Sequence, residues 1–280
     1  MLNVSEIEKI LKQGSSLPAI VSDEHGKKYL MKFKGAGEGM KNSISEFIAS
    51  SVAALIGLPV LKPVLIKLDE CAVNKVKNDE LYDLINWSKG INIAFEFLEN
   101  AVSTDRSDKI FSVEDPLITL IYLYDCFLLN IDRNPSNNNL LIVNGKIIAT
   151  DYGASYLINN LIRKDPDFHS EKIISQLRRN PFYSKNPDIG ILMNRFKELD
   201  LNSLKKIIED IPDEWFVFFD KTSGAIKDKL NSALYEKIND PDFIIRTINL
   251  IDKTELVSED QLRLKRKENL KFFEDRFGKM

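Results

Sequence analysis

The chain has 280 residues, in which 39 lysines and arginines nearly balance 42 aspartates and glutamates, leaving a formal net charge of −3. This balance provides no broad basic face, so direct binding to nucleic acid or to an anionic membrane is not predicted. The length allows one bilobal unit or two small domains.

Cysteine usage and hydropathy indicate a cytoplasmic protein. Cys71 and Cys126 lie far apart without a second thiol at metal-ligand spacing, so neither a disulfide framework nor a structural zinc site is expected. The longest apolar stretch, residues 117–131, is interrupted by Asp125 and is too short to cross a bilayer. The acidic, amphipathic N-terminus differs from a signal peptide.

The first elements predicted are a helix and a strand pair. Helical spacing of apolar residues predicts a short opening helix over residues 4–13. Residues 17–23 and 27–34 are then predicted to be strands, because β-branched and aromatic residues flank the turn signal at residues 24–26.

One major helix and two further strands complete a strand-rich first lobe. Ser43-x-x-Glu46 has the pattern of a capping box that opens a helix over residues 43–57. Strand-like residues follow at 62–69 and 91–98.

The chain then becomes mostly helical. A strongly apolar helix is predicted over residues 112–130, with Ser112 as its cap. Asn144-Gly145 between two apolar runs predicts a β-hairpin over residues 139–150. Helical patterns recur at residues 202–211, 222–238, 241–251 and 258–277.

Small oxygen-bearing side chains surround the predicted hairpin. Asp132 and Asn137 precede it and Asp151 follows it, so the hairpin should return Asp151 close to Asn137. A carboxylate and an amide oxygen suit a hard cation such as magnesium, which takes further ligands from phosphates. Asp132 is then available to orient a hydroxyl group. The order D-x-x-x-x-N, hairpin, D-x-G is typical of phosphoryl transfer.

A purely structural interpretation of these residues is a polar turn around Pro135, with Asp151 ending the hairpin. Asp-x-Gly alone is common. The ordered combination is more specific, and it favours the catalytic interpretation.

The first lobe offers residues that could bind nucleotide. Lys32 is the candidate for the phosphates, although Lys34 lies on the same strand face and alternation does not separate them. Glu46 is expected either to orient Lys32 or only to cap its helix.

Two backbone segments are further candidates. The stretch Gly14-Ser15-Ser16 would offer N–H groups to phosphates, or would simply end a helix and begin a turn. The strand end at Glu96-Phe97-Leu98 lies where a hinge would present backbone groups to adenine.

These motifs resemble those of the HipA-like kinases, in particular a small stand-alone branch of that family. The similar stretches run in family order from about residue 14 to residue 216, and the specific part is "NIDRNPSNNNLL" together with "DYG". The resemblance implies an α+β, bilobal protein-kinase-like fold with a strand-rich N-terminal lobe and a mostly helical C-terminal lobe. The lobes would be residues 1–98, which bind the nucleotide phosphates, and residues 99–280, which carry the catalytic loop and the metal-binding hairpin.

The resemblance also implies ATP and magnesium (Mg2+) as cosubstrate and cofactor, and transfer of the γ-phosphoryl group to a serine or threonine of a protein. It matches Asp132 with the catalytic aspartate, Asn137 and Asp151 with the metal ligands, and Lys32 with the phosphate-binding lysine. It matches Glu96-Phe97-Leu98 with the hinge. A small DNA-binding, antitoxin-like partner is common beside such kinases.

Some alternatives remain open at this point. Asn134 stands where the wider group has a histidine, so no histidine base is expected, and Asn139 competes with Asn137 as metal ligand. A nucleotide-binding pseudokinase or regulatory module, and a kinase for lipids or small molecules, are the rival functions. The phosphorylated substrate is not indicated by the sequence.

Overall fold

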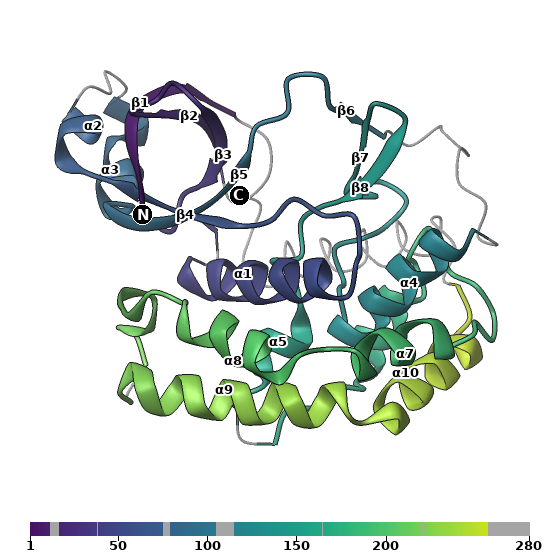
Figure 1. The fold of residues 1–280 in the computed structure, drawn as a ribbon. Helices are drawn as coiled ribbons and strands as arrows, with labels where there is room; N and C mark the ends of the chain where they lie inside the picture. The colour runs from purple at the N-terminus through teal and green to yellow at the C-terminus, as the bar shows by residue number, and fades with distance from the viewer. Residues whose placement is uncertain are drawn as a thin grey trace, which may run out of the picture.

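Five strands of the N-terminal half close into a small barrel (Figure 1). The structure is a computed structural model that describes residues 1–11, 17–37, 39–74, 79–104, 115–163, 165–219 and 221–256. The strand order around the barrel is β1-β2-β3-β5-β4, with β1 and β4 parallel and the other neighbours antiparallel. The barrel strands are β1 Leu2–Ile10, β2 Ala19–Asp23, β3 Lys28–Lys32, β4 Val64–Leu68 and β5 Gly90–Glu96. All four strands predicted in this lobe are confirmed.

The opening helix predicted over residues 4–13 is wrong, because residues 2–10 form β1. Two register shifts, between Val4 and Glu6 and between Ile7 and Lys9, each insert one extra residue into this strand. A β-bulge of this kind interrupts the alternation of faces. Val4, Ile7 and Ile10 therefore turn toward the barrel interior at intervals of three, which imitates helical spacing.

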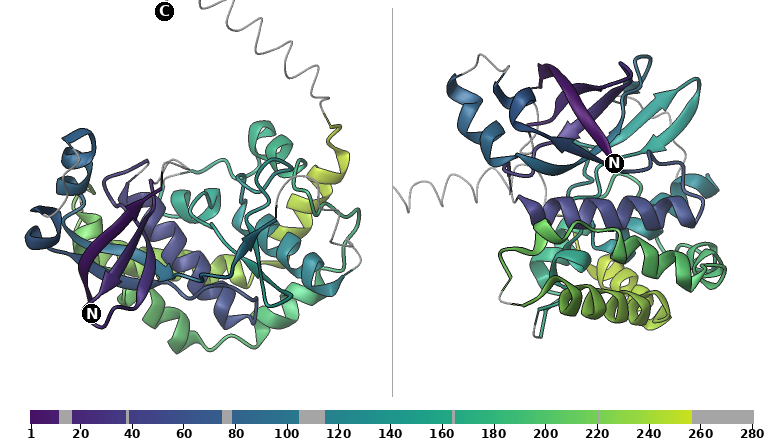
Figure 2. Two further views of the ribbon diagram at one scale, coloured as in Figure 1. Left: turned by 90° about the horizontal axis from the view of Figure 1, so that it is seen from above. Right: turned by 60° about the vertical axis from the view of Figure 1, so that its left-hand side comes forward.

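Helix α1 (Met40–Leu55) lies beneath the barrel and above the helices of the second half, as Figures 1 and 2 both show. It begins three residues before the predicted Ser43, and Gly39 precedes it without a side-chain cap. The predicted capping box is therefore wrong. Most of α1 is buried, because it is covered on both sides.

The second half is built around a strongly apolar helix, α4 (Pro116–Leu128), whose N-cap is Asp115 and whose one charged residue is Asp125. Ser112, the predicted cap, lies outside the described residues. The predicted helices near 202–211, 222–238 and 241–251 are confirmed as α8, α9 and α10, whereas residues 258–277 lie outside the described part. The remaining helices are α2 Glu70–Asn74, α3 Asp79–Trp87, α5 Tyr156–Asn160, α6 Glu171–Leu177, α7 Gly190–Lys197, α8 Leu201–Glu209, η1 Asp213–Phe216 (a 3-10 turn), α9 Ser223–Ile238 and α10 Pro241–Lys253.

The predicted hairpin is confirmed as β7 (Leu140–Val143) and β8 (Lys146–Ala149). A third strand, β6 (Val102–Ser103), pairs with β7. Asn144 and Gly145 both have positive φ, 51° and 75°, as the tight turn between twisted strands requires. The backbone N–H of Ala149 donates to the Pro59 carbonyl at 2.8 Å, which attaches the hairpin to the segment that leaves α1.

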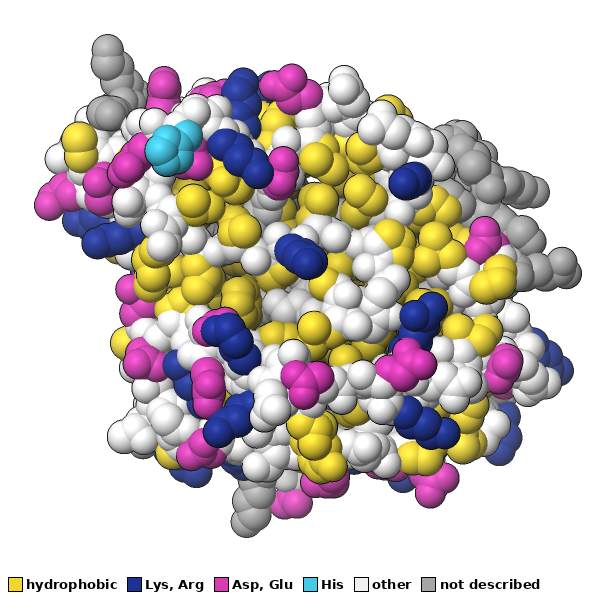
Figure 3. Space-filling model, viewed as in Figure 1, with side chains coloured by type: hydrophobic (Ala, Val, Ile, Leu, Met, Phe, Trp, Pro, Cys, Tyr) yellow, Lys and Arg dark blue, Asp and Glu magenta, His cyan; other side chains and the backbone are white. Residues whose placement is uncertain are grey.

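Charged side chains of both signs are interspersed on the face shown in Figure 3, with no continuous patch of one sign. Among the described helices, none combines the length and the apolar character that a membrane span requires.

Two glycine substitutions should change stability in opposite directions. Gly145→Ala meets no atom within 4 Å but forces an alanine to φ +75°, so we expect it to lower the free energy of unfolding by about 1 kcal/mol. Gly224→Ala, in α9, also has open space and requires no positive φ, so it should raise this free energy by about 0.5 kcal/mol. Urea unfolding of both variants measures the two changes. If both variants changed the free energy of unfolding by the same amount and in the same direction, the left-handed conformation assigned to Gly145 in the turn would be contradicted.

Candidate active site

A cavity of about 690 Å³ lies between the barrel, α1 and the loops that flank the β7–β8 hairpin. Side chains predicted to be functional converge on it from four different segments of the chain. They are Lys32, Glu46, Asp132, Asn137 and Asp151.

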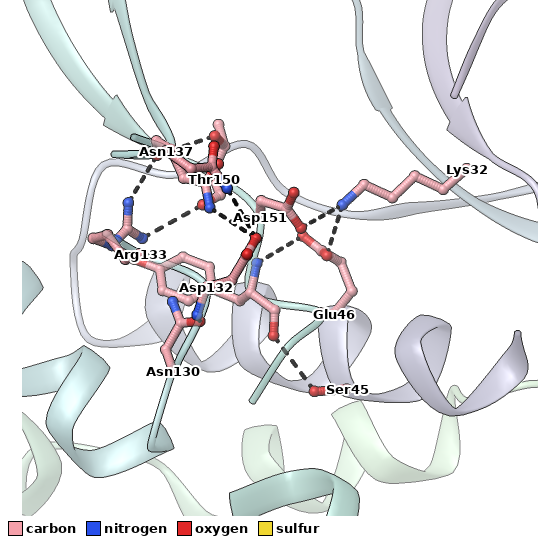
Figure 4. A network of polar contacts seen from close by, with 12 residues as sticks. Lys32, Ser45, Glu46, Asn130, Asp132, Arg133, Asn137, Thr150 and Asp151 are labelled. Atoms are coloured by element: carbon pink, nitrogen blue, oxygen red, sulfur yellow. Dashed lines mark hydrogen bonds and ion pairs between the residues drawn. The ribbon is translucent and has the colours of Figure 1, made fainter. Parts of the chain in front are cut away.

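Lys32, near the end of β3, connects the two halves of the molecule across this cavity (Figure 4). Its Nζ lies 2.8 Å from Glu46 Oε2 and 2.9 Å from Asp151 Oδ1. Burial by itself would lower the pKa of Lys32, but the Asp151 and Glu46 carboxylates raise it above its usual value, so the ammonium group stays charged. Lys34, the sequence alternative, instead pairs with Glu214 outside the cavity.

Glu46 holds the lysine from α1 and also contacts the segment that contains Asp151. Its Oε1 accepts a hydrogen bond from the backbone N–H of Tyr152 at 3.1 Å. Burial raises the pKa of Glu46, and Lys32 opposes this effect. A Cβ at Gly153 would lie 2.8 Å from Glu46 Oε2, so the glycine of the Asp-x-Gly motif allows Glu46 to approach this closely.

Asp151 follows the hairpin in a left-handed conformation, with φ 60°. This conformation is unusual for a residue with a side chain, and such residues concentrate at functional sites. The conformation allows the carboxylate to reach Lys32, and the ammonium group of Lys32 lowers the pKa of Asp151. Asp151 therefore stays ionised.

The loop after α4 presents Asp132 to the same cavity. Asp132 Oδ2 accepts hydrogen bonds from Asn137 Nδ2 at 3.0 Å and from Asn139 Nδ2 at 3.4 Å. Burial and the nearby Asp151 carboxylate raise the pKa of Asp132. A carboxylate whose proton affinity is raised is better suited to interact with the proton of a hydroxyl group.

Arg133 is an important residue that the sequence analysis did not single out. Its guanidinium is fully buried and pairs with Asp125 of α4, with 2.6 Å between Nε and Oδ2. It also donates to the backbone carbonyls of Asn139 and Thr150, at 2.9 and 3.4 Å. Arg133 therefore joins the loop after α4 to both ends of the hairpin. The sequence signal was Asp125, the single charge within the apolar stretch.

The oxygen donors at the cavity fit a hard cation that takes its remaining ligands from phosphate and water. Asp151 supplies a carboxylate and Asn137 an amide oxygen, and both line the cavity, whereas Asn139 does not. Within the described residues, no group of three or more histidine, cysteine, aspartate or glutamate side chains forms a complete metal site by itself.

One set of predicted residues, Glu96-Phe97-Leu98, is not brought to the cavity. Glu96, Phe97 and Leu98 are not among the described residues that line it. The Phe97 N–H donates to the Lys28 carbonyl at 3.0 Å, which extends the β3–β5 pairing and leaves this group unavailable to adenine. Gly14-Ser15-Ser16 lies outside the described residues.

The charge pair beneath the loop should be essential for stability. Asp125→Asn leaves the buried Arg133 guanidinium without its counter-charge, so we expect the free energy of unfolding to fall by about 3–5 kcal/mol. Asp210→Asn is the matched control, since it breaks an exposed pair with Lys206 and should cost less than about 1 kcal/mol. Urea unfolding measures both values. Similar losses for the two variants would contradict this role of Asp125.

Comparisons with known proteins identify the fold and the family. No curated protein sequence matches the chain. The Helicobacter pylori proinflammatory kinase CtkA has a similar structure, with a TM-score of 0.53 at 14% identity over 90% of this chain and 97% of that one. The Golgi casein kinase has a TM-score of 0.50 at 11% identity, over 90% of this chain and 75% of its own. These similarities confirm the predicted protein-kinase-like fold. A family model for the HipA-like kinase matches residues 4–244, and because it spans most of the chain, this protein belongs to the HipA-like kinase family.

Proposed function

We propose that this chain is a magnesium-dependent kinase that transfers the γ-phosphoryl group of ATP to a serine or threonine of a protein, with its own chain as one possible acceptor. The observation that carries the proposal is the bridge from Lys32 to both Glu46 and Asp151, facing Asp132 in one cavity. Family membership supports phosphotransfer, and the site chemistry supports the finer assignment.

Each residue has a separate task in this proposal. Lys32 binds phosphate oxygens, and Glu46 holds its ammonium group in the cavity. Asp151 and Asn137 hold magnesium, which supplies positive charge against the charge that develops on the phosphates. Asp132 accepts a hydrogen bond from the acceptor hydroxyl and aims its oxygen for in-line attack. The rate enhancement comes from positioning and charge stabilisation.

The interactions of Asp132 in the structure fit this task. The amide groups of Asn137 and Asn139 both donate to Oδ2 and fix the orientation of the carboxylate. Both of these hydrogen bonds go to Oδ2, so the other carboxylate oxygen, Oδ1, is available to the hydrogen of an acceptor hydroxyl group.

Replacement of either aspartate should abolish most turnover. We expect Asp132→Asn to reduce phosphoryl transfer at least about 100-fold, because it removes the group that interacts with the hydroxyl proton. Asp151→Asn should reduce turnover similarly and should also raise the magnesium requirement strongly. Transfer from labelled ATP to generic protein acceptors and to the chain itself measures both effects. Activity of Asp132→Asn within a few-fold of the parent would refute the assignment, and an inactive parent would favour a pseudokinase.

A second pair of variants distinguishes the two asparagines. Loss of even an outer partner of a metal ligand weakens metal affinity about 10–100-fold, so Asn137→Ala should raise the magnesium concentration for half-maximal activity at least about tenfold. Asn139→Gly preserves the left-handed backbone at φ 50° and should leave this concentration nearly unchanged. A magnesium titration of turnover gives both values. The opposite order would assign the metal to Asn139.

A further inference from the structure

A short segment of the helical half binds the barrel at the strand end that follows Lys32. The segment is the 3-10 turn η1, Asp213–Phe216. The Glu214 carboxylate pairs with Lys34 Nζ, and Glu214 Oε1 also accepts a hydrogen bond from the backbone N–H of Ile91 at 2.8 Å. One side chain therefore contacts both β5 and the residue two places beyond Lys32.

The strand register explains why these contacts matter for the cavity. Lys32 pairs with Ile93 in the antiparallel β3–β5 ladder. This is the last pair of the ladder, since β3 ends at Lys32, and beyond it the N–H of Lys34 donates to the side-chain oxygen Asn92 Oδ1 at 2.9 Å. Glu214 thus contacts both chains just beyond the last pair of the ladder, which contains Lys32.

Trp215 attaches the same segment to β5 and to α1. Its Nε1 donates to the Ile91 carbonyl at 2.8 Å. Its ring lies edge-on to Phe47, with the centroids 6.3 Å apart, and Phe47 follows Glu46 in α1. Trp215 is fully buried, so this contact is part of the packed core between the halves. Ile93, which pairs with Lys32 in the ladder, is two residues from Ile91, and Glu46 is adjacent to Phe47 in α1. The contacts of η1 therefore lie close to both residues.

The backbone at Gly90 is shaped around this contact. Gly90 has φ 102°, and a Cβ there would lie 2.5 Å from Glu214 Oε1 and 2.6 Å from Lys34 Nζ. Glycine is needed at this position for both reasons. Lys34 is buried, and Glu214 is the carboxylate that it contacts in the described part of the chain. Loss of Glu214 would leave a buried ammonium group unpaired, which is strongly unfavourable.

We propose that Glu214 and Trp215 form an interlobe clamp that sets the position of Lys32 and Glu46 relative to Asp151. Neither side chain touches the cavity, so both are positioning residues. The kinetic part of this inference rests on the proposed kinase function, whereas the mechanical part does not. Because a small displacement of a phosphate-binding group reduces turnover steeply, the clamp should affect catalysis from outside the site.

The mechanical part is tested by hydrogen exchange of the protein without nucleotide. In Glu214→Ala we expect the paired amides of β3 and β5, and those of α1 near Glu46, to exchange at least about tenfold faster. Amides of the β7–β8 hairpin should keep the parent rates. Glu214→Gln retains an acceptor for Ile91 N–H and should give an intermediate change. Unchanged exchange in β3 and β5 of Glu214→Ala would overturn the clamp.

The kinetic part is tested below the melting temperature of each variant, where all are folded by circular dichroism. We expect kcat/KM for ATP to fall at least about tenfold in Glu214→Ala and in Trp215→Phe. The value for Glu214→Gln should lie between those of the parent and Glu214→Ala. A purely structural role would lower the melting temperature without changing turnover of the folded protein, and this result would overturn the positioning role.

Two control variants lie close to the clamp. Glu209→Gln removes a carboxylate from an exposed pair with Lys205, and Phe218→Ala removes an aromatic ring that is 78% exposed. Both should keep the parent values of exchange and kcat/KM, and an effect as large as that of Glu214→Ala would overturn the specific role of the clamp. If the parent transfers no phosphoryl group, the proposed function fails, and exchange alone then decides whether the clamp exists.

Discussion

The ammonium group of Lys32 is the interaction on which the arrangement of this molecule depends. It is shared between two carboxylates, one from α1 and one from the segment after the β7–β8 hairpin, so it links three parts of the fold that are far apart in sequence. Glu46 is only 2% exposed and Lys32 is 16% exposed, and a charge so far removed from water is tolerated only when its counter-charge is correctly placed. Strand β3, helix α1 and the segment after the hairpin must therefore be placed so that Lys32 reaches both carboxylates.

Separate supports hold each partner of Lys32. Helix α1 is packed between the barrel and the lower helices, so Glu46 has little freedom. Asp151, in its left-handed conformation, directly follows the hairpin end, and Arg133 with Asp125 attaches the loop after α4 to this hairpin. The β3 strand is held by its ladder with β5 and by the contacts from η1. A site assembled in this way is preorganised, which is the main requirement of phosphoryl transfer.

The errors of the sequence analysis have specific physical causes. In β1, two bulges converted alternation into a spacing of three, and apolar spacing alone does not distinguish this pattern from a helix. Ser43-x-x-Glu46 has the letters of a capping box, but α1 begins earlier, and Glu46 is then free to bind Lys32. Arg133 was overlooked because its partner, Asp125, is hidden in an apolar helix whose burial only the packed fold reveals.

The sequence by itself determined the class of fold, most of the strands and helices, the Asn144-Gly145 turn, and the order in which Asp132, Asn137 and Asp151 occur around the hairpin. The class of fold was implied by the resemblance to the HipA-like kinases, whereas the other features are local and follow from periodicity, turn chemistry and residue spacing. Only the tertiary structure decided between Lys32 and Lys34, because alternation along the predicted strand puts both on one face and they differ in what lies opposite them. Lys32 meets two carboxylates in the cavity, whereas Lys34 meets Glu214 from η1. The position of a distant partner depends on how whole elements pack, and no local pattern in the sequence contains that information.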